Sequence, residues 1–577
     1  MKKTKIANAK KPNLLVLLKN YQGYITLLII LGIVSSGFGL FLPKIASSWI
    51  DTFEGSHHLE LKYVYQFAGL SVVIFIATFL QGLVQTLASE NVAKDLRTKL
   101  IQKISLQSYD FIEKQTSAKL LTNITADVDS IKLFISLAVA SIISSIVIIF
   151  GASGMLLYLD LKLALAVLTI IPLIGFLFFI LFSQVKVLFK ASREVIDKLN
   201  RIINESVFGA TLIRVLNSKN EECAKFDTVN IESRDVGIKI LNIFASLIPL
   251  VTFIASLATL TVLLLGGYFV VNHSMTLGGF AAFNSYIMLL IFPIIILGFM
   301  SNLIAQASAS YERIMSVLDA VEPTLNKTTD HPIVGNIELS NVYLSYNKKP
   351  VLKNISLNIK ANTKTAIIGP TAAGKTQLIN LLIGLTKPDS GDIIIDGHNI
   401  NEINPQALHR QVGLVFQDSI LFNLSLKENI DFSDSANEPN IVKAIKTAEL
   451  EDLIASLPNG LSTIISERGT NLSGGQKQRI MLARALAINP RILLLDDFTA
   501  RVDNKTEQNI LANLAKDYTH TTLISVTQKI SAIKNYDQII LLMEGELIGT
   551  GTHAQLLSTC PEYAQIYSSQ QSTNEYE

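Results

Sequence analysis

Hydrophobic and polar positions divide the chain into two halves with different patterns. Up to about residue 310, long apolar runs alternate with short or charged connections. From residue 337 onward, short alternating strands and turns take their place. A helix needs about 20 apolar residues to cross the hydrocarbon core of a bilayer. The apolar runs therefore predict six transmembrane helices, over residues 24–42, 65–87, 134–158, 161–182, 243–271 and 277–304.

The connections between these predicted spans differ in length and charge. Only Leu159 and Asp160 separate the third span from the fourth, and residues 272–276 separate the fifth from the sixth. Lysines and arginines gather before the first span and in the two long connections, after the second and fourth spans. Because cytosolic loops carry the excess of basic residues, we expect both termini and both long connections to be cytosolic. Helical periodicity over 92–106 and 194–216 predicts that membrane helices continue into these connections.

Composition agrees with a membrane protein. The 577 residues are 49% hydrophobic and 17% charged, whereas soluble domains carry about 25% charged residues. A formal net charge of +2 argues against a nucleic-acid partner. Cys223 and Cys560 lie in no CxxC or Cys/His cluster, so neither a disulfide framework nor a cysteine metal site is indicated.

Polar side chains are rare inside the predicted spans. No Asp, Glu, Lys or Arg lies mid-span, which disfavours proton-coupled transport because buried ionisable groups form proton relays. The amides either line a substrate cavity or join neighbouring helices, and we prefer the second interpretation. They are Gln66, Gln81, Gln85, Asn284 and Asn302.

A change of pattern marks the domain boundary. Residues 321–336 contain Pro323, Pro332 and Gly335 among polar residues, which is typical of a linker. We therefore predict an α-helical membrane domain over 1–320, which includes the two long cytosolic connections. A soluble α/β domain over 337–577 follows the linker.

The first candidate functional motif in the second half of the chain is a glycine-rich loop. A short β-rich run, 365–368, leads into the loop, and a helical run, 378–382, follows it. In this strand–loop–helix context, backbone N–H groups cradle phosphates. Lys375 then contacts the β and γ phosphates, and Thr376 offers a hydroxyl to Mg²⁺. The predicted nucleotide-binding residues of the loop are Gly369, Pro370, Thr371, Ala372, Ala373, Gly374, Lys375, Thr376 and Gln377.

A second motif supplies carboxylates. The apolar run 492–495 ends in Asp496 and Asp497. Packing accounts for the run, but two adjacent aspartates at its end indicate a functional site. A carboxylate at Asp496 can hold Mg²⁺ through water.

These motifs together resemble those of the ATP-binding cassette (ABC) family, and the whole chain resembles a half-transporter of the six-helix exporter type. The resemblance implies that Tyr346 stacks on adenine and that Gln417 senses Mg²⁺. It also implies that Asp503 belongs to the loop after the metal-binding strand. By the same resemblance, 337–577 is an α/β P-loop ATPase domain, and the cytosolic loops around 109–121 and 204–216 are its coupling loops. The family signature, which closes over the ATP of a second cassette, matches Leu472, Ser473, Gly474, Gly475 and Gln476.

Three positions depart from the family pattern. Asp497 replaces the usual catalytic glutamate, and its carboxylate is retracted by about one methylene, which general-base catalysis tolerates poorly. Gln528 replaces a histidine that contacts the γ-phosphate, and glutamine cannot become a cation. Ala372 replaces a glycine, which is unfavourable if the position needs a positive φ.

Loss of both the glutamate and the histidine resembles the degenerate subunit of heterodimeric exporters. The resemblance implies an ATP-driven translocase whose own site, with Asp497 and Gln528 in the catalytic positions, is weakly active. The intact signature would complete the site of a partner half-transporter. A homodimer, a siderophore-type importer on the same scaffold and a catalytically silent scaffold are the alternatives. The spans do not identify the substrate. We expect a multi-pass protein of the inner (plasma) membrane.

Overall fold

The computed structural model describes residues 14–58, 60–322, 331–346 and 349–574. The N-terminal lysines at positions 2–11, the middle of the predicted linker and Pro323 lie outside the described residues. The chain divides into two compact units. The helical unit comprises Met1–Leu106 and Gln115–Val321, and the α/β unit comprises Gln107–Lys114 and Glu322–Glu577.

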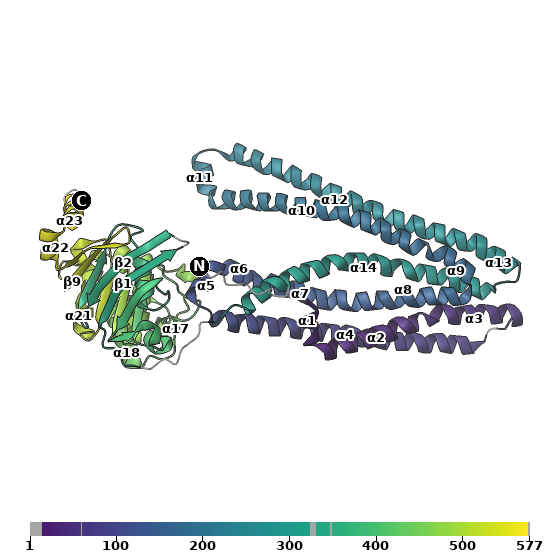
Figure 1. Ribbon diagram of the computed structural model, residues 1–577, viewed down its shortest axis with the longest axis horizontal. Coiled ribbons are helices and arrows are strands. Elements are labelled where there is room, and N and C mark those ends of the chain that lie inside the picture. Colours follow the sequence, from purple (N-terminus) through teal and green to yellow (C-terminus); the bar gives the residue numbers. More distant parts are fainter. Residues whose placement is uncertain (1–13, 59, 323–330, 347–348, 575–577) are drawn as a thin grey trace. The chain divides into compact units, whose positions relative to one another are not determined.

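Long helices dominate the first part of the chain (Figure 1). The segments labelled η1 to η3 are π-helical turns that interrupt longer helices. In order, the elements are α1 (Leu14–Lys19), α2 (Gln22–Gly39), α3 (Phe41–Ser56), α4 (Leu61–Ser105), α5 (Tyr109–Gln115), α6 (Ser117–Thr122), η1 (Asn123–Asp127), α7 (Val128–Leu133), η2 (Phe134–Val139), α8 (Ala140–Leu159), α9 (Leu161–Leu168), α10 (Ile170–Phe208), α11 (Ala210–Val215), α12 (Lys219–Thr261), η3 (Val262–Gly266), α13 (Gly267–Val271) and α14 (Leu277–Leu318).

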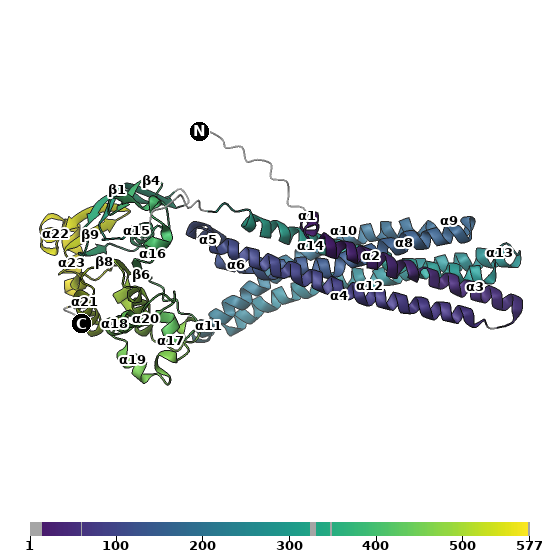
Figure 2. The same cartoon turned by 90° about the horizontal axis from the view of Figure 1, so that it is seen from below.

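Helix pairs run side by side within the helical unit. Helix α2 packs on α4, and α8 packs on α14 (Figure 2). Helices α10 and α12 form another pair, which diverges from the other helices of the unit toward α11 (Figure 1). A buried cluster that includes Leu156, Leu163 and Phe283 joins α8, α9 and α14. Both α4 and α10 extend well beyond the apolar runs, as the periodicity of 92–106 and 194–216 predicts.

Most of the predicted spans coincide with helices that are long and apolar enough to cross a membrane. Among the described residues, five such stretches occur: Gln22–Gly55, Leu61–Ser105, Ser117–Leu159, Pro249–Val271 and Leu277–Leu318. The fourth span, 161–182, is not among these five and stays a prediction. It falls on α9 and the start of α10, which are separated at Thr169. Pro172 has no N–H to donate to the carbonyl of Leu168, where α9 ends.

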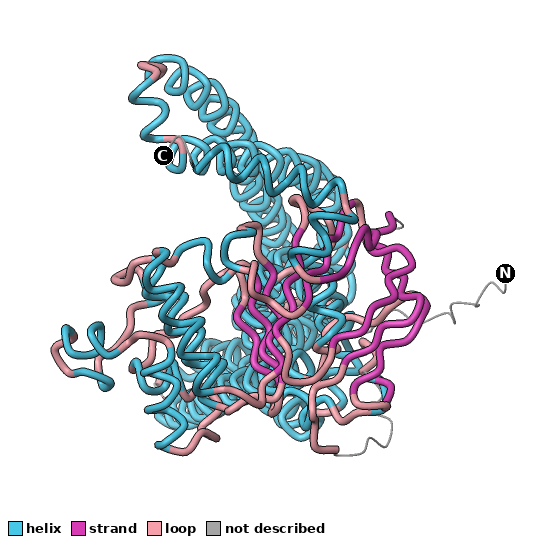
Figure 3. The backbone as a smooth tube through the Cα atoms, turned by 90° about the vertical axis from the view of Figure 1, so that its left-hand side faces the viewer, coloured by secondary structure: helices cyan, strands magenta, loops and turns pink. Residues whose placement is uncertain are grey.

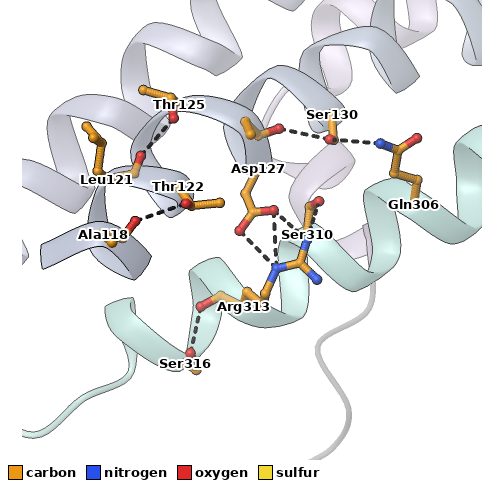
Figure 4. A network of polar contacts seen from close by, with 11 residues as sticks. Ala118, Leu121, Thr122, Thr125, Asp127, Ser130, Gln306, Ser310, Arg313 and Ser316 are labelled. Carbon is orange, nitrogen blue, oxygen red and sulfur yellow. Dashed lines mark hydrogen bonds and ion pairs between the residues drawn. The ribbon is translucent and has the colours of Figure 1, made fainter. Parts of the chain in front are cut away.

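An ion pair between a buried carboxylate and a half-exposed guanidinium joins α14 to the π-turn η1. The carboxylate of Asp127 is 3% exposed and accepts hydrogen bonds from Nε of Arg313 at 2.9 and 3.2 Å (Figure 4). Nη2 of the same guanidinium donates to Asp127 Oδ1 and to Ser310 Oγ. These bonds fix the relative positions of two segments that are far apart in sequence.

Two sheets form the α/β unit, and Figure 3 shows its strands gathered together. The four-stranded antiparallel sheet has the order β2-β1-β4-β5, and the six-stranded sheet has the order β10-β9-β3-β8-β7-β6. The strands are β1 (Ile337–Tyr346), β2 (Lys349–Ile359), β3 (Lys364–Ile368), β4 (Ser390–Ile395), β5 (His398–Asn399), β6 (Val412–Val415), β7 (Ile492–Asp496), β8 (Thr522–Val526), β9 (Gln538–Met543) and β10 (Glu546–Gly551).

Successive residues of the central strands face two different cores. In β7, Leu493 and Leu495 join one buried cluster, while Leu494 joins the other. Both faces are therefore covered, as is usual for parallel sheets. The helices and short turns of this unit are α15 (Lys375–Leu382), η4 (Ile400–Glu402), α16 (Pro405–His409), α17 (Leu426–Ile430), α18 (Glu438–Thr447), α19 (Glu451–Ser456), η5 (Gly460–Ser462), η6 (Glu467–Gly469), α20 (Gly474–Ala487), η7 (Phe498–Arg501), α21 (Asn504–Asp517), η8 (Ile530–Ala532), α22 (His553–Thr559) and α23 (Pro561–Asn574).

Candidate nucleotide site

The predicted site residues converge because of the sheet topology. Strands β3, β8, β7 and β6 are parallel neighbours. Their carboxyl ends therefore meet at one edge of the sheet, where ligands bind in open α/β folds. The glycine-rich loop follows β3, Gln417 follows β6, Asp497 follows β7 and Gln528 follows β8. Residues from four separate parts of the sequence thus share one edge.

These residues line a cavity of about 370 Å³. Gly369 and Pro370 belong to the loop but not to the cavity wall, and the other predicted loop residues line it. Tyr346, Gln417, Asp496, Asp497 and Gln528 line it as well. Sequence analysis missed three further lining residues, which no motif marks: Val351, Val526 and Thr527.

The glycine-rich loop needs glycine where its backbone passes close to neighbouring strands. A Cβ at Gly369 would lie 1.9 Å from the carbonyl oxygen of Leu542. Gly374 has φ +93, and a Cβ there would lie 2.7 Å from Leu352 Cδ2. Ala372 has φ +65, so this alanine does occupy the left-handed region that disfavours it.

Replacing Ala372 by glycine should make the α/β unit slightly more stable. The left-handed conformation costs an L-residue about 1 kcal/mol, and the greater freedom of glycine in the unfolded chain offsets part of this gain. We expect a net gain of about 0.5 kcal/mol, measured by urea unfolding of the purified chain followed by proteolysis. Ala373→Gly is the matched control, because Ala373 is buried and has no positive φ. It should lose about 1 kcal/mol, and equal losses for both variants would contradict strain at Ala372.

Lys375, Thr376 and Asp496 form the polar centre of the cavity. The Lys375 ammonium donates to the carbonyls of Gly369 at 2.8 Å and Pro370 at 2.7 Å. Burial lowers the pKa of Lys375, while the nearby Asp496 and Asp497 carboxylates oppose that shift. Burial likewise raises the pKa of Asp496, and the Thr376 hydroxyl, 3.0 Å away, opposes it. Opposite charges therefore lie near each other in a partly buried site.

The residues present fit a hydrated Mg²⁺ ion bound with a nucleotide phosphate. Such ions take oxygen ligands and are held by one or two protein groups plus phosphates. Thr376 and Asp496 place two oxygens within 3.0 Å of each other, and Gln417 lines the same cavity. Gln377 Oε1 is a buried acceptor without a hydrogen-bond partner among the described residues. No cluster of three or more His, Cys, Asp or Glu occurs in the described part of the chain, so the fit depends on phosphate and water.

The two altered positions lie in this cavity with distinct backbone settings. Asp497 is half-buried with φ +48, and its N–H donates to the carbonyl of Val526 at 3.0 Å. Aspartate tolerates this left-handed region better than most residues. Gln528 is exposed, and its carbonyl accepts a 2.6 Å hydrogen bond from Nε2 of Gln570. Oε1 of Gln570 accepts from the Ile530 N–H at 2.9 Å. The side-chain amide of Gln570, on α23, therefore bonds to the backbone of the Gln528 loop at two positions, Gln528 and Ile530.

Removing this amide should loosen the loop. In Gln570→Ala, the N–H of Ile530 and the carbonyl of Gln528 each lose a hydrogen bond worth about 1 kcal/mol. We expect amide hydrogen exchange at 528–530 to become several-fold faster. Gln571→Ala is the control, because Gln571 donates only to Tyr567 within the described residues. Unchanged exchange in Gln570→Ala would show that the loop keeps its position without α23.

The signature residues lie outside the cavity, at the N-terminus of the 14-residue helix α20. Ser473 is the N-cap: its Oγ accepts from the Gln476 N–H at 3.2 Å, and Gln476 Oε1 accepts from the Ser473 N–H at 2.8 Å. This reciprocal arrangement is a capping box. A Cβ at Gly475 would lie 2.7 Å from the carbonyl oxygen of Arg501, so the chain there needs glycine. Leu472 packs against the neighbouring core.

Two contacts connect the signature helix and the segment after β7 to their surroundings. Nε2 of the buried Gln478 donates to the carbonyl of Gln417 at 3.1 Å, which joins α20 to the loop after β6. Asp503 is the N-cap of α21 and accepts from the Thr506 N–H at 3.0 Å. That hydrogen bond lowers the pKa of Asp503. The side chain of Asp503 is thus engaged in capping a helix.

Comparisons with known proteins identify families and relatives that this chain resembles. The model "ABC transporter transmembrane region" matches residues 25–294, and the model "ABC transporter" matches 352–500. "Uncharacterized ABC transporter ATP-binding protein YfiB" of Bacillus subtilis (strain 168) is 33% identical over 96% of this chain and 97% of its own length. A "Putative multidrug export ATP-binding/permease protein" of Staphylococcus aureus (strain NCTC 8325 / PS 47) is 31% identical, with 96% and 98% covered.

Two further similarities are more distant. The "ATP-dependent lipid A-core flippase" of Syntrophus aciditrophicus (strain SB) is 30% identical over 85% of this chain and 82% of its own length. A solved structure titled "Structure of a bacterial Atm1-family ABC exporter with ATP bound" superposes with a TM-score of 0.78. It is 24% identical and covers 96% of this chain and 99% of its own, so the similarity concerns the fold alone.

Proposed function

The chain belongs to the ABC transporter family, and on that premise we propose that it is one half of a heterodimeric exporter whose own ATP site is degenerate. Family membership makes it an integral membrane protein of exporter type with an ATP-hydrolysing cassette. The proposal adds the division of labour between two subunits, an Mg²⁺ ion bound with the ATP, and a location in the inner (plasma) membrane with both termini in the cytosol.

One observation supports this division more than any other: an altered cavity and a well-formed signature occur in the same α/β unit. The cavity wall carries Asp497 and Gln528 at the positions of the activating glutamate and the γ-phosphate histidine. The signature residues 472–476, by contrast, are intact and lie at the N-terminus of α20. A silent scaffold has no need of an intact signature, but the second ATP site of a transporter requires one.

Each residue of this chain's own cavity would have a separate role in binding ATP and Mg²⁺ and in positioning water. Lys375 and the backbone N–H groups at the start of α15 would bind the phosphates. Thr376 and Asp496 would hold Mg²⁺, with Gln417 beside them, and Tyr346 would contact the adenine. Bound Mg²⁺ neutralises charge on the β and γ phosphates. The shorter Asp497 would position water poorly, because general-base catalysis depends on placement to about 1 Å.

Mg²⁺-ATPase activity of the purified chain tests the proposal, first alone and then with the product of any neighbouring transporter gene. We expect low activity alone and at least tenfold higher activity with the partner. The higher activity should disappear when the partner's catalytic glutamate is changed. Strong activity of this chain alone, abolished by Asp497→Asn, would instead establish a homodimer in which Asp497 is the working base. Uptake into inside-out and right-side-out vesicles then distinguishes export from import.

A further inference from the structure

A cavity of about 490 Å³ lies within the helical unit, between α2, α4, α8 and α14. Its lining falls within four predicted spans. This volume is in the range of sites that enclose drug-sized ligands, about 300–1,000 Å³. The cavity's polar lining residues lie mainly on α4 and α8, whereas all the lining residues of α14 are apolar.

The polar wall consists of hydroxyl and amide side chains. Helix α4 contributes Gln81 and Gln85, and α8 contributes Ser141 and Ser144. Gln81 is buried and accepts a long 3.4 Å hydrogen bond from Ser35, so this amide does join neighbouring helices. Within the described residues, no hydrogen bond is formed by the side chains of Gln85, Ser141 or Ser144. Gln85 thus fits the cavity interpretation that the sequence left open.

The polar groups of Gln85, Ser141 and Ser144 are free to bond to a polar partner in the cavity. An amide that loses water without gaining another hydrogen bond costs several kcal/mol in an apolar medium, so a ligand that excludes water from this wall must offer polar groups of its own. Gln85 offers both a donor and an acceptor, and each serine hydroxyl offers both as well. The polar wall is therefore suited to a ligand group that donates and accepts hydrogen bonds.

The apolar lining residues belong mainly to α14 and are called the apolar wall here. Met288, Phe292 and Ile296 line it, with Met288 51% and Phe292 71% exposed. Methionine and aromatic side chains adapt to varied apolar shapes. A ligand that satisfies both walls has a hydrogen-bonding group and a flat or branched apolar body.

No ionisable side chain lines this cavity among the described residues. A fixed ligand charge at membrane depth would need a counter-charge, which these walls do not supply. We propose that the cavity binds the transported substrate, and that this substrate is an uncharged, drug-sized amphiphile rather than a cationic compound or a phosphate-bearing lipid. This inference rests on the proposed transport function.

Three dyes of similar size test the charge preference: neutral Nile red, cationic rhodamine 6G and anionic fluorescein. Binding to the full-length chain in lipid nanodiscs, with its partner where one is required, is measured by fluorescence anisotropy after subtracting the signal of empty nanodiscs. We expect saturable binding of Nile red at least tenfold tighter than that of either charged dye. Tighter binding of either charged dye would overturn the proposal.

Gln85→Glu should reverse the preference. A carboxylate in the polar wall should weaken Nile red about tenfold and strengthen rhodamine 6G by a similar factor. Gln66→Glu is the matched control, because Gln66 lies on the same helix, is exposed and does not line the cavity. Ser144→Ala is a milder second variant that removes one hydroxyl, and it should weaken Nile red several-fold.

Three results would overturn the proposal. The first is equal dye binding by the Gln85→Glu and Gln66→Glu variants. The second is unchanged Nile red affinity in Ser144→Ala. The third is loss of subunit assembly without any change in dye binding, which would identify a helix of the partner as the occupant.

Basal Mg²⁺-ATPase activity of the same nanodiscs separates the claim about the cavity from the claim of transport function. Normal activity without saturable Nile red binding would refute the cavity but leave the transporter function standing.

Discussion

Ser473→Ala in this chain should reduce ATP hydrolysis by the assembled transporter about a hundredfold, although the cassette still folds. The Ser473 Oγ accepts a hydrogen bond from the Gln476 N–H, so its own proton is free to be donated to a phosphate oxygen of the partner-held ATP. Removing one preorganised donor to developing negative charge costs about 10²–10³ in rate. Loss of the cap alone costs about 1 kcal/mol of stability. Steady-state Mg²⁺-ATPase assays of the complex measure the expected loss.

Thr552→Ala is the control for the capping role. Thr552 forms the same kind of capping box with Gln555 at the start of α22. Its loss should lower stability by about the same 1 kcal/mol and leave hydrolysis within about twofold. Similar ATPase rates in the two variants would show that Ser473 only caps its helix, and the catalytically silent scaffold would then be favoured.

Sequence reasoning located the nucleotide cavity because its residues sit in short motifs attached to strands. An apolar run followed by a glycine-rich loop fixes a strand and the turn after it. Parallel pairing then brings the ends of β3, β6, β7 and β8 to one edge. For Ala372 the sequence raised only the condition that the position needs a positive φ, and the structure meets that condition with φ +65.

The sequence alone did not predict which residues far apart in the chain contact each other. The Gln570 amide reaches a loop 42 positions away, and Arg313 meets an aspartate 186 positions away. Neither residue belongs to a motif, and a single sequence does not reveal which polar side chains pair in space. The positive φ of Asp497 was likewise missed, because aspartate is common in both ordinary and left-handed conformations.

The helix boundaries illustrate a second physical limit. Apolar length locates the part of a helix that lies in lipid, but nothing in hydropathy requires the helix to end there. Helix α4 runs from Leu61 to Ser105, well past the apolar run that ends at residue 87. The polar part of α4 beyond residue 87 is predicted only by the weaker helical periodicity over 92–106. The separation of α9 from α10 at Thr169 lies close to Pro172, whereas α12 and α14 continue through Pro249 and Pro293, so a proline in the sequence does not by itself locate a helix end.

Arg313→Ala should destabilise the helical unit by about 2–3 kcal/mol. The substitution removes every guanidinium hydrogen bond to the Asp127 carboxylate, which is 3% exposed. Breaking a buried ion pair by removing one partner leaves an uncompensated charge and costs about 3–5 kcal/mol. The Arg313 side chain is itself 48% exposed, so water entering its place reduces that cost. Denaturant unfolding of the purified chain in one detergent measures the difference.

Arg97→Ala is the matched control in the same region. Arg97 pairs with Asp129 at 2.7 Å, but the two side chains are 40% and 54% exposed. Such exposed pairs contribute about 0–1 kcal/mol, so this variant should stay close to the unaltered protein. In the Arg313→Ala background, Asp127→Asn should recover part of the lost stability, because a neutral amide is cheaper to bury than an unpaired carboxylate. The two arginine variants could instead lose equal free energy of unfolding, with no recovery by Asp127→Asn. That result would mean that water reaches Asp127 and that its ion pair does not stabilise the packing of η1 against α14.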